Sequence, residues 1–404
     1  MLPNVATLES TRKAYLIFMS GLAGLVFLLS HTSQAASQSM ASLLLLVSPG
    51  LLLIKQKPLP STIKVFIALA ISIYIYALTT FFLHPNSDVA FVTIRGLTFY
   101  LLAPITIATL WNFRFSRKAL FFFIFCAALI SLYPVLKEII TYQGTKRGST
   151  SVHPIFWGNI CLTTGFVAFI LSRDPDLPVR AKRVMGWAAL ACAITASLWS
   201  LTRGGWLSVP VILVLLTYFR VISLKHLVVI VISLTTVFLT SDDVRNRVMN
   251  TVNSGKLDTS TTHRLEMWSI SLHAFEKNPI IGNGLDGFAK QNLEENKQKK
   301  VNFYYEHAHN EYFEVLASRG IIGLLLLGSL LISLAFVYVT NRNSIYAKAG
   351  IIVLSQYIIF SLTETFFTTK SPVTYFIILN ALLLFAIYKE SIKNPGPERI
   401  PNEP

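Results

Sequence analysis

The chain has 404 residues, of which 53% are hydrophobic and 14% are charged. A charged share so far below the roughly 25% of soluble domains excludes an ordinary soluble fold and predicts an integral membrane protein. The net charge of +15 does not indicate nucleic-acid binding, because most basic residues stand in short segments between apolar runs, the arrangement that marks cytoplasmic loops of a membrane protein.

Twelve apolar runs have a length close to the roughly 20 residues that a helix needs to cross a membrane. Backbone groups in lipid must be hydrogen-bonded within their own segment, so each run is expected to be an α-helix. The predicted spans are residues 14–31, 39–54, 63–83, 90–111, 119–140, 152–172, 183–201, 205–220, 224–240, 315–339, 346–366 and 371–388. We therefore expect one all-α domain over residues 1–404, with a disordered, Pro-rich tail at 393–404.

Basic residues concentrate in alternate loops, which predicts that those loops and both termini are cytoplasmic. The first run follows Arg12 and Lys13 and could pass for a cleaved signal peptide, but its length favours an uncleaved span. A few cations fall on the opposite side: Arg95, Lys146, Arg147, Arg203 and Lys370. Because these residues oppose the orientation rule, we expect a function other than topology to retain them.

Asp174-Pro175-Asp176 matches the acid-x-acid pattern by which many glycosyltransferases hold a divalent metal ion. The motif lies on the predicted cytoplasmic side, and its proline favours a solvated turn. The first predicted outer loop, where metal-dependent transferases place such acids, has none. The sequence therefore does not predict a metal site.

The longest polar segment, residues 241–316, lies between the ninth and tenth predicted spans, on the outer side. Within it we predict a helix over 261–277 that begins close to Arg264. A cation near a helix N-terminus is disfavoured by about 0.3–1 kcal/mol, yet the helix dipole and the guanidinium together favour a bound anion such as phosphate. An exposed arginine without a role is an equally good interpretation.

Polar side chains gather where this segment meets the tenth predicted span: Glu306, His307, His309, Asn310, Glu311, Tyr312 and Glu314. Their desolvation is costly, which suggests a function. His309 has the properties of a general base, and Glu306, Glu311 or Glu314 is close enough in sequence to orient it. A zinc site is not expected, because His307 and His309 would point to different faces of a helix. A histidine satisfied by local hydrogen bonds is the alternative.

Arg203 stands between the seventh and eighth predicted spans and is followed by two glycines. Glycine allows a ligand to approach the backbone closely, and a guanidinium can bind phosphate oxygens in a bidentate manner. The alternative is an arginine that extends its side chain to the membrane interface. Weaker candidates on the same predicted side are Arg95, a charge within a predicted span, and Arg147 and His153 in the loop before the sixth span.

Several of these motifs resemble those of the O-antigen ligase family. His309-Asn310, nine further residues and Gly320-Ile321-Ile322-Gly323 resemble the family signature H-[NSQ]-x9-G-x-x-[GTY]. Thr202-Arg203-Gly204-Gly205-Trp206 resembles the family's arginine-containing outer-loop motif. Arg264-Leu265-Glu266-Met267-Trp268, followed by Asn278-Pro279-Ile280-Ile281-Gly282-Asn283-Gly284, resembles the stretch after its second arginine. The motifs cover about residues 200–325.

The resemblance implies a glycosyltransferase of the GT-C type that works without a metal ion or other cofactor. Such an enzyme transfers O-antigen from undecaprenyl diphosphate to the lipid A-core oligosaccharide, with inversion, at the periplasmic face of the bacterial inner membrane. It implies that His309 is the catalytic base and that Arg203 and Arg264 bind the diphosphate. The implied partners are the lipid-linked glycan donor, the lipid A-core acceptor and membrane lipids.

Three alternatives remain open. The family signature does not separate a ligase from a polysaccharide polymerase, which uses a second lipid-linked glycan as acceptor. A protein O-oligosaccharyltransferase is a related possibility. A secondary transporter belongs to another class, and the sequence lacks the internal repeat that many transporters show.

Overall fold

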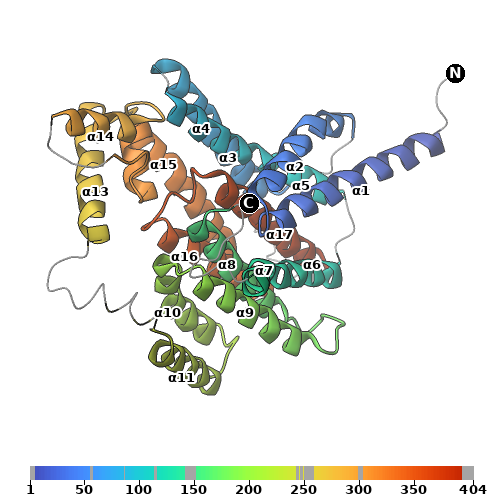
Figure 1. The fold of residues 1–404 in the computed structure, drawn as a ribbon. Coiled ribbons are helices and arrows are strands. Elements are labelled where there is room, and N and C mark those ends of the chain that lie inside the picture. The colour runs from blue at the N-terminus through green and yellow to red at the C-terminus, as the bar shows by residue number, and fades with distance from the viewer. Residues whose placement is uncertain are drawn as a thin grey trace, which may run out of the picture.

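The protein is described by a computed structural model that covers residues 5–54, 58–85, 87–112, 116–141, 152–242, 245, 249, 259–298 and 304–393. Within these ranges the chain forms helices, turns and short 3-10 segments, and no strand (Figure 1). This confirms the predicted all-α architecture. Arg147 and the predicted tail from residue 394 onward lie outside the described residues.

The helices before the long polar segment are α1 (Val5–Leu29), α2 (Gln34–Val47), η1 (Ser48–Leu53), α3 (Ser61–Leu83), α4 (Asp88–Leu97), η2 (Thr98–Leu101), α5 (Leu102–Trp111), α6 (Arg117–Ile130), α7 (Tyr133–Thr141), α8 (Pro154–Leu171), α9 (Lys182–Trp199), α10 (Arg203–Tyr218) and α11 (Leu224–Thr240). The helices that follow are α13 (Thr259–Lys277), α14 (Gly287–Lys297), α15 (Glu311–Thr340), α16 (Ile345–Phe360) and α17 (Lys370–Lys393).

Every predicted span overlaps one helix or up to three consecutive helical segments. Among the described residues, 7 helices are long and apolar enough to cross a membrane, and three shorter helices are also apolar. The chain is therefore a multi-pass membrane protein, while the total of twelve spans stays a prediction. The fourth span is broken by the 3-10 segment η2, shortly before Pro104, whose missing N–H weakens a continuous helix.

Helices α8 and α17 form the centre of the bundle. The side chains of α8 from Trp157 to Leu171 are all buried, and α17 is similarly enclosed. Their central position follows from their packing against several neighbouring helices each. The central helices thus provide a rigid support for the loops at their ends.

Helices α13 and α14, from the polar segment, pack beside α15 on the side of the molecule away from α1 and α2 (Figure 1). Their contact uses a kink in α15 at Gly320, which has a φ of 62°. A Cβ atom there would overlap the backbone of Ile280, and Ile321 donates its N–H to the carbonyl of Pro279 at 2.9 Å. The first glycine of the signature is thus required both by its own backbone and by the segment packed against it.

Candidate functional site

The loop between α16 and α17, residues 361–369, organises the polar cluster and is called here the 361–369 loop. Asn310 donates its side-chain N–H to the carbonyl of Leu362 at 3.2 Å, and the backbone N–H of Glu311 donates to the first carbonyl of the loop at 2.9 Å. The Asn310 Oδ1 atom also accepts the N–H of Tyr312 at 2.9 Å and caps α15. The start of α15 is therefore fixed to the loop.

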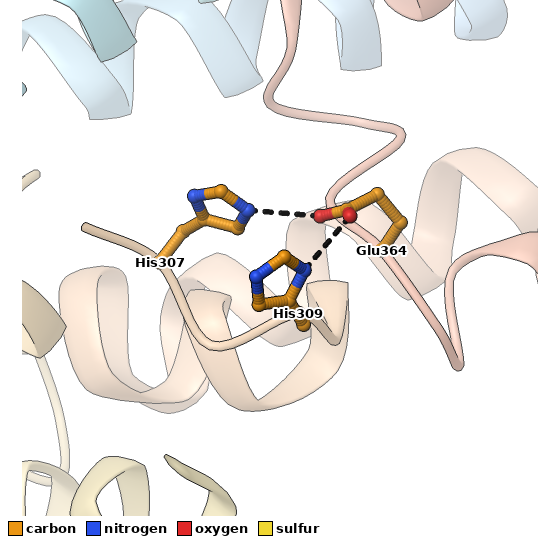
Figure 2. Close-up of side chains that lie close together, drawn as sticks. All are labelled: His307, His309 and Glu364. Atoms are coloured by element: carbon orange, nitrogen blue, oxygen red, sulfur yellow. Dashed lines mark hydrogen bonds and ion pairs between the residues drawn. The ribbon is translucent and has the colours of Figure 1, made fainter. Parts of the chain in front are cut away.

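Both histidines reach the carboxylate of Glu364, in the middle of this loop (Figure 2). Nε2 of His307 lies 3.0 Å from one carboxylate oxygen, and Nδ1 of His309 lies 2.8 Å from the other. The backbone N–H of Thr365 donates to the first oxygen at 3.1 Å. The Glu364 side chain is 2% exposed, compared with 39% for His307 and 22% for His309. A buried carboxylate thus holds two imidazoles that remain partly accessible.

The partner of His309 is therefore not one of the three carboxylates predicted from sequence. Glu306 is exposed. Glu311 is buried and accepts a backbone N–H of the 361–369 loop at 2.8 Å. Glu314 is buried and accepts the backbone N–H of the residue between the two histidines at 2.9 Å. Glu364 follows His309 by 55 residues. The sequence feature that could have identified Glu364 as a candidate is that it is a carboxylate within a predicted span. That eleventh span was predicted to reach residue 366, but α16 ends at Phe360.

The prediction that the two histidines point to different helix faces is also wrong. Neither lies in a helix, because α15 begins at Glu311. His309 has a φ of 48°, in the left-handed region that non-glycine residues seldom adopt. The two ring centroids lie 4.3 Å apart, so a turn brings both imidazoles to one carboxylate. Strained backbone of this kind is concentrated at functional sites.

Charge and hydrogen bonding define the protonation of the cluster. Burial on its own raises the pKa of Glu364, but hydrogen bonds and charges from both histidines lower that pKa well below its usual range. Burial lowers the pKa of His307, but the hydrogen bond to Glu364 and nearby carboxylates raise it overall above 6.5. An ionised carboxylate only accepts hydrogen bonds, so Nδ1 of His309 is the donor in this contact, and the lone pair of that tautomer is on Nε2.

Arg203 is brought to the same loop. It is the first residue of α10, and the backbone of the next residue, Gly204, lies directly against the side chain of Thr363. A Cβ at Gly204 would overlap the Thr363 hydroxyl, so glycine is needed for this approach. Thr363 immediately precedes Glu364. The guanidinium of Arg203 and the N-terminus of α10 therefore lie on a helix that contacts the residue next to Glu364.

Arg264 lies in α13, which reaches the cluster through its neighbour His263. Nδ1 of His263 is 3.5 Å from the hydroxyl of Tyr305, and the Tyr305 ring meets that of His309 edge to face, with centroids 5.6 Å apart. Helix α13 begins at Thr259, earlier than predicted. Arg264 is therefore in the second turn, where the helix dipole acts weakly, and its own charge is the main attraction for an anion.

Arg95 is exposed on α4 beside the same loop. The residue that follows it, Gly96, lies against the backbone of Thr368. The charge of Arg95 is also close enough to act on Lys370, at the start of α17. Two cations thus flank the end of the 361–369 loop.

His153 is the exposed N-terminal cap of α8. Its ring lies 5.8 Å from that of Phe156, which in turn lies 5.2 Å from Phe366 in the 361–369 loop. The structure therefore places His153 at the edge of the site. Its proposed companion Arg147 falls outside the described residues.

Two other predicted candidates hold the framework together. Tyr312 donates its hydroxyl to the carbonyl of Ile358 at 3.1 Å and so joins α15 to α16. Asn310 caps α15 and binds the 361–369 loop, as described above. Glu306 is exposed, and its charge helps to raise the pKa of His307. These contacts assign positioning roles to Tyr312 and Asn310.

Comparison with known proteins agrees with the motifs. Residues 188–328 match a protein-family model described as O-antigen ligase. This part of the chain is therefore similar to the O-antigen ligase family. The matched region contains Arg203, Arg264 and His309, while Glu364 lies beyond it. An uncharacterized protein of Haemophilus influenzae is 23% identical over 300 residues, which are 68% of this chain and 74% of that protein.

Proposed function

We propose that the protein is a glycosyltransferase that moves a glycan from a polyprenyl diphosphate carrier to an acceptor hydroxyl. The family match supports this class of reaction. More specifically, we propose a GT-C-type ligase that joins O-antigen from undecaprenyl diphosphate to the lipid A-core at the periplasmic face of the inner membrane. The observation that carries the proposal is the pairing of His309 with a buried carboxylate, beside the helix that begins with Arg203.

In this mechanism His309 is the general base. Its Nε2 lone pair accepts the proton of the acceptor hydroxyl as the oxygen attacks the anomeric carbon. Glu364 keeps the proton on Nδ1 and stabilises the imidazolium that forms, as a carboxylate does in other histidine-based catalysts. Attack opposite the leaving group inverts the anomeric centre.

The leaving group needs charge stabilisation and no added proton. The bond between the anomeric carbon and the phosphate oxygen breaks, and its electron pair remains on the diphosphate. Arg203 and Arg264 would bind these oxygens, and the N-terminus of α10 adds its dipole at the same place. Interactions that strengthen as negative charge develops lower the barrier to transfer.

The test is a transfer assay with purified protein, a defined lipid-linked glycan and EDTA. We expect transfer to lipid A-core to persist in the chelator. Transfer to a second lipid-linked glycan instead would identify a polymerase, and transfer to a protein hydroxyl would identify an O-oligosaccharyltransferase. Movement of the intact donor across vesicles without transfer to any acceptor would contradict the proposal and favour a transporter.

Arg203→Lys tests whether the guanidinium binds the diphosphate in a bidentate manner. Lysine retains the charge but loses the planar pair of donors, so we expect at least about a tenfold loss of transfer. Full activity in this variant would mean that Arg203 serves only at the membrane interface.

A further inference from the structure

We propose that His307, His309 and Glu364 form a binding site for a divalent transition-metal ion, with zinc the best fit, and that the bound ion inhibits transfer. The binding site stands on geometry alone, whereas its inhibitory effect rests on the proposed function. Figure 2 shows the three side chains converging from two parts of the chain.

The donor atoms suit such an ion. The three residues offer one ligand atom each, and these atoms lie within 4.8 Å of one another. Ligands of one tetrahedral zinc ion, at about 2.0–2.2 Å from it, are roughly 3.4 Å apart. The two nitrogen–oxygen distances of 3.0 and 2.8 Å need only a slight opening to admit the ion between them. Two imidazoles and one carboxylate are a ligand set that zinc accepts, with further positions open to water.

The surroundings hold the ligands in place. The Glu364 carboxylate is fixed by the N–H of Thr365 at 3.1 Å, and the backbone between the histidines is fixed by Glu314, which accepts the N–H of Ala308 at 2.9 Å. Hydrogen bonds of this kind orient metal ligands and raise affinity. The partial exposure of both imidazoles leaves a path for the ion and its waters.

A second histidine–glutamate pair, with one imidazole instead of two at its carboxylate, serves as a comparison for the proposed metal site. His273 and Glu295 lie 2.9 Å apart between α13 and α14, but the other contact of that carboxylate oxygen is the amide of Gln291. One imidazole and one carboxylate make a weak metal site. The pair therefore provides a matched control within the same chain.

Metal binding would inhibit His309 through its tautomer. The ion takes the Nδ1 lone pair, so the proton that Nδ1 carries must move to Nε2 through solvent. The ring then has no lone pair for the acceptor hydroxyl. His307, bound through Nε2, similarly carries its proton on Nδ1. A metal-independent transferase would thus be inactivated by the ion without any change in the diphosphate site.

The binding test uses full-length protein in detergent, with any affinity tag removed, and titrates Co²⁺ by visible absorption and Zn²⁺ by equilibrium dialysis. We expect one ion per chain. His307→Gln, a change at a partly exposed side chain, is expected to weaken binding by at least about 100-fold, with His309→Gln similar. His273→Gln is expected to bind as the parent does. Absence of stoichiometric binding, or equal metal affinity of the His307→Gln variant and the parent protein, would overturn the site.

Gel filtration and thermal unfolding establish that each variant is folded before its metal affinity is compared. The activity arm adds Zn²⁺ to the transfer assay, and we expect a loss of at least about tenfold that excess EDTA reverses. Ion binding by a protein without transferase activity would contradict the proposed function but leave the site intact. Transfer that is insensitive to Zn²⁺, by a protein that binds the ion, would overturn the inhibitory role.

Discussion

Helices α16 and α17 carry a polar cluster at each end, and the two clusters are built in opposite ways. At one end Arg117 is surrounded by carboxylates, with Asp174 at 3.0 Å, Asp176 at 2.8 Å and Glu390 at 3.6 Å. The Tyr346 hydroxyl donates to Asp174 at 3.2 Å. At the other end, the histidine–Glu364 cluster places one buried carboxylate between two imidazoles.

The first cluster joins helix ends through one guanidinium, three carboxylates and a tyrosine hydroxyl. It ties α6, the α8–α9 turn, α16 and α17 together, which is a stabilising function. Asp174 was predicted to lie in a solvated turn, but its side chain is 4% exposed because Arg117 and Tyr346 enclose it. The acid-x-acid motif thus serves as an ion-pair clamp.

The histidine–Glu364 cluster differs because it contains imidazoles, the side chain best suited to proton transfer, and both rings remain partly exposed. A group of this kind can accept and release a proton during a reaction, which Arg117 cannot do. The comparison shows that buried charge alone does not identify a functional site. What distinguishes one is a titratable group that is held in place yet left open on one side.

The largest expected effect is the loss of the proposed base. His309→Gln is expected to reduce the turnover number for transfer by about 10²- to 10⁴-fold, because the side chain loses the nitrogen lone pair that accepts the acceptor proton. The unfolding temperature is expected to change little, since His309 is partly exposed. Turnover measured under saturating donor, at equal amounts of folded protein, checks this. Retained turnover would remove the base assignment.

The opposite cluster is expected to affect stability instead. Arg117→Met leaves Asp174 buried without its guanidinium, which typically costs about 3 kcal/mol or more. We expect a lower unfolding temperature and unchanged turnover per folded molecule. Lys277→Gln, in the exposed pair with Glu294, is the control and is expected to shift stability by less than about 1 kcal/mol. Equal stability of the Arg117 variant and the parent would contradict the clamp.

Glu364→Gln tests whether Glu364 both stabilises the imidazolium of His309 and fixes its tautomer. The amide no longer stabilises an imidazolium, and its N–H₂ group can reverse the His309 tautomer. We expect transfer to fall by about 100-fold or less, with an altered dependence of turnover on pH. A merely structural residue would lower the yield of folded protein and leave the pH profile of the remaining activity unchanged.

The smallest expected effect is a pH-dependent stability difference between the parent and Glu364→Gln, measured in EDTA. The lowered pKa of Glu364 contributes stability above the unfolded value of 4.5, which is lost as pH falls through the folded pKa. The raised pKa of His307 contributes stability below 6.5, which is lost as pH rises through its folded pKa. The difference in unfolding temperature should therefore be largest between these two values. A difference independent of pH would contradict the ion pairing.

Local patterns predicted much of this molecule. Apolar runs located the helices. The positions of Arg203, Arg264 and His309 were read from motifs, and their elements do meet near the 361–369 loop. Their catalytic roles stay predictions.

The pairing of His309 with Glu364 could not be predicted, because it depends on how α15 packs against α16 and α17. Glu364 was assigned to a span because the predicted span continued beyond the end of α16, to Phe366. Hydropathy does not distinguish a buried loop from a helix. The convergence of His307 and His309 was missed for a related reason, since a left-handed residue replaced the expected helical geometry.

The most direct test of the central claim is an experimental structure of the protein bound to undecaprenyl diphosphate in a lipid nanodisc. We expect diphosphate density in contact with Arg203 and Arg264, with Nε2 of His309 facing the space where the acceptor hydroxyl attacks. Diphosphate bound at the Arg117 end of the bundle, or contacting neither arginine, would contradict it.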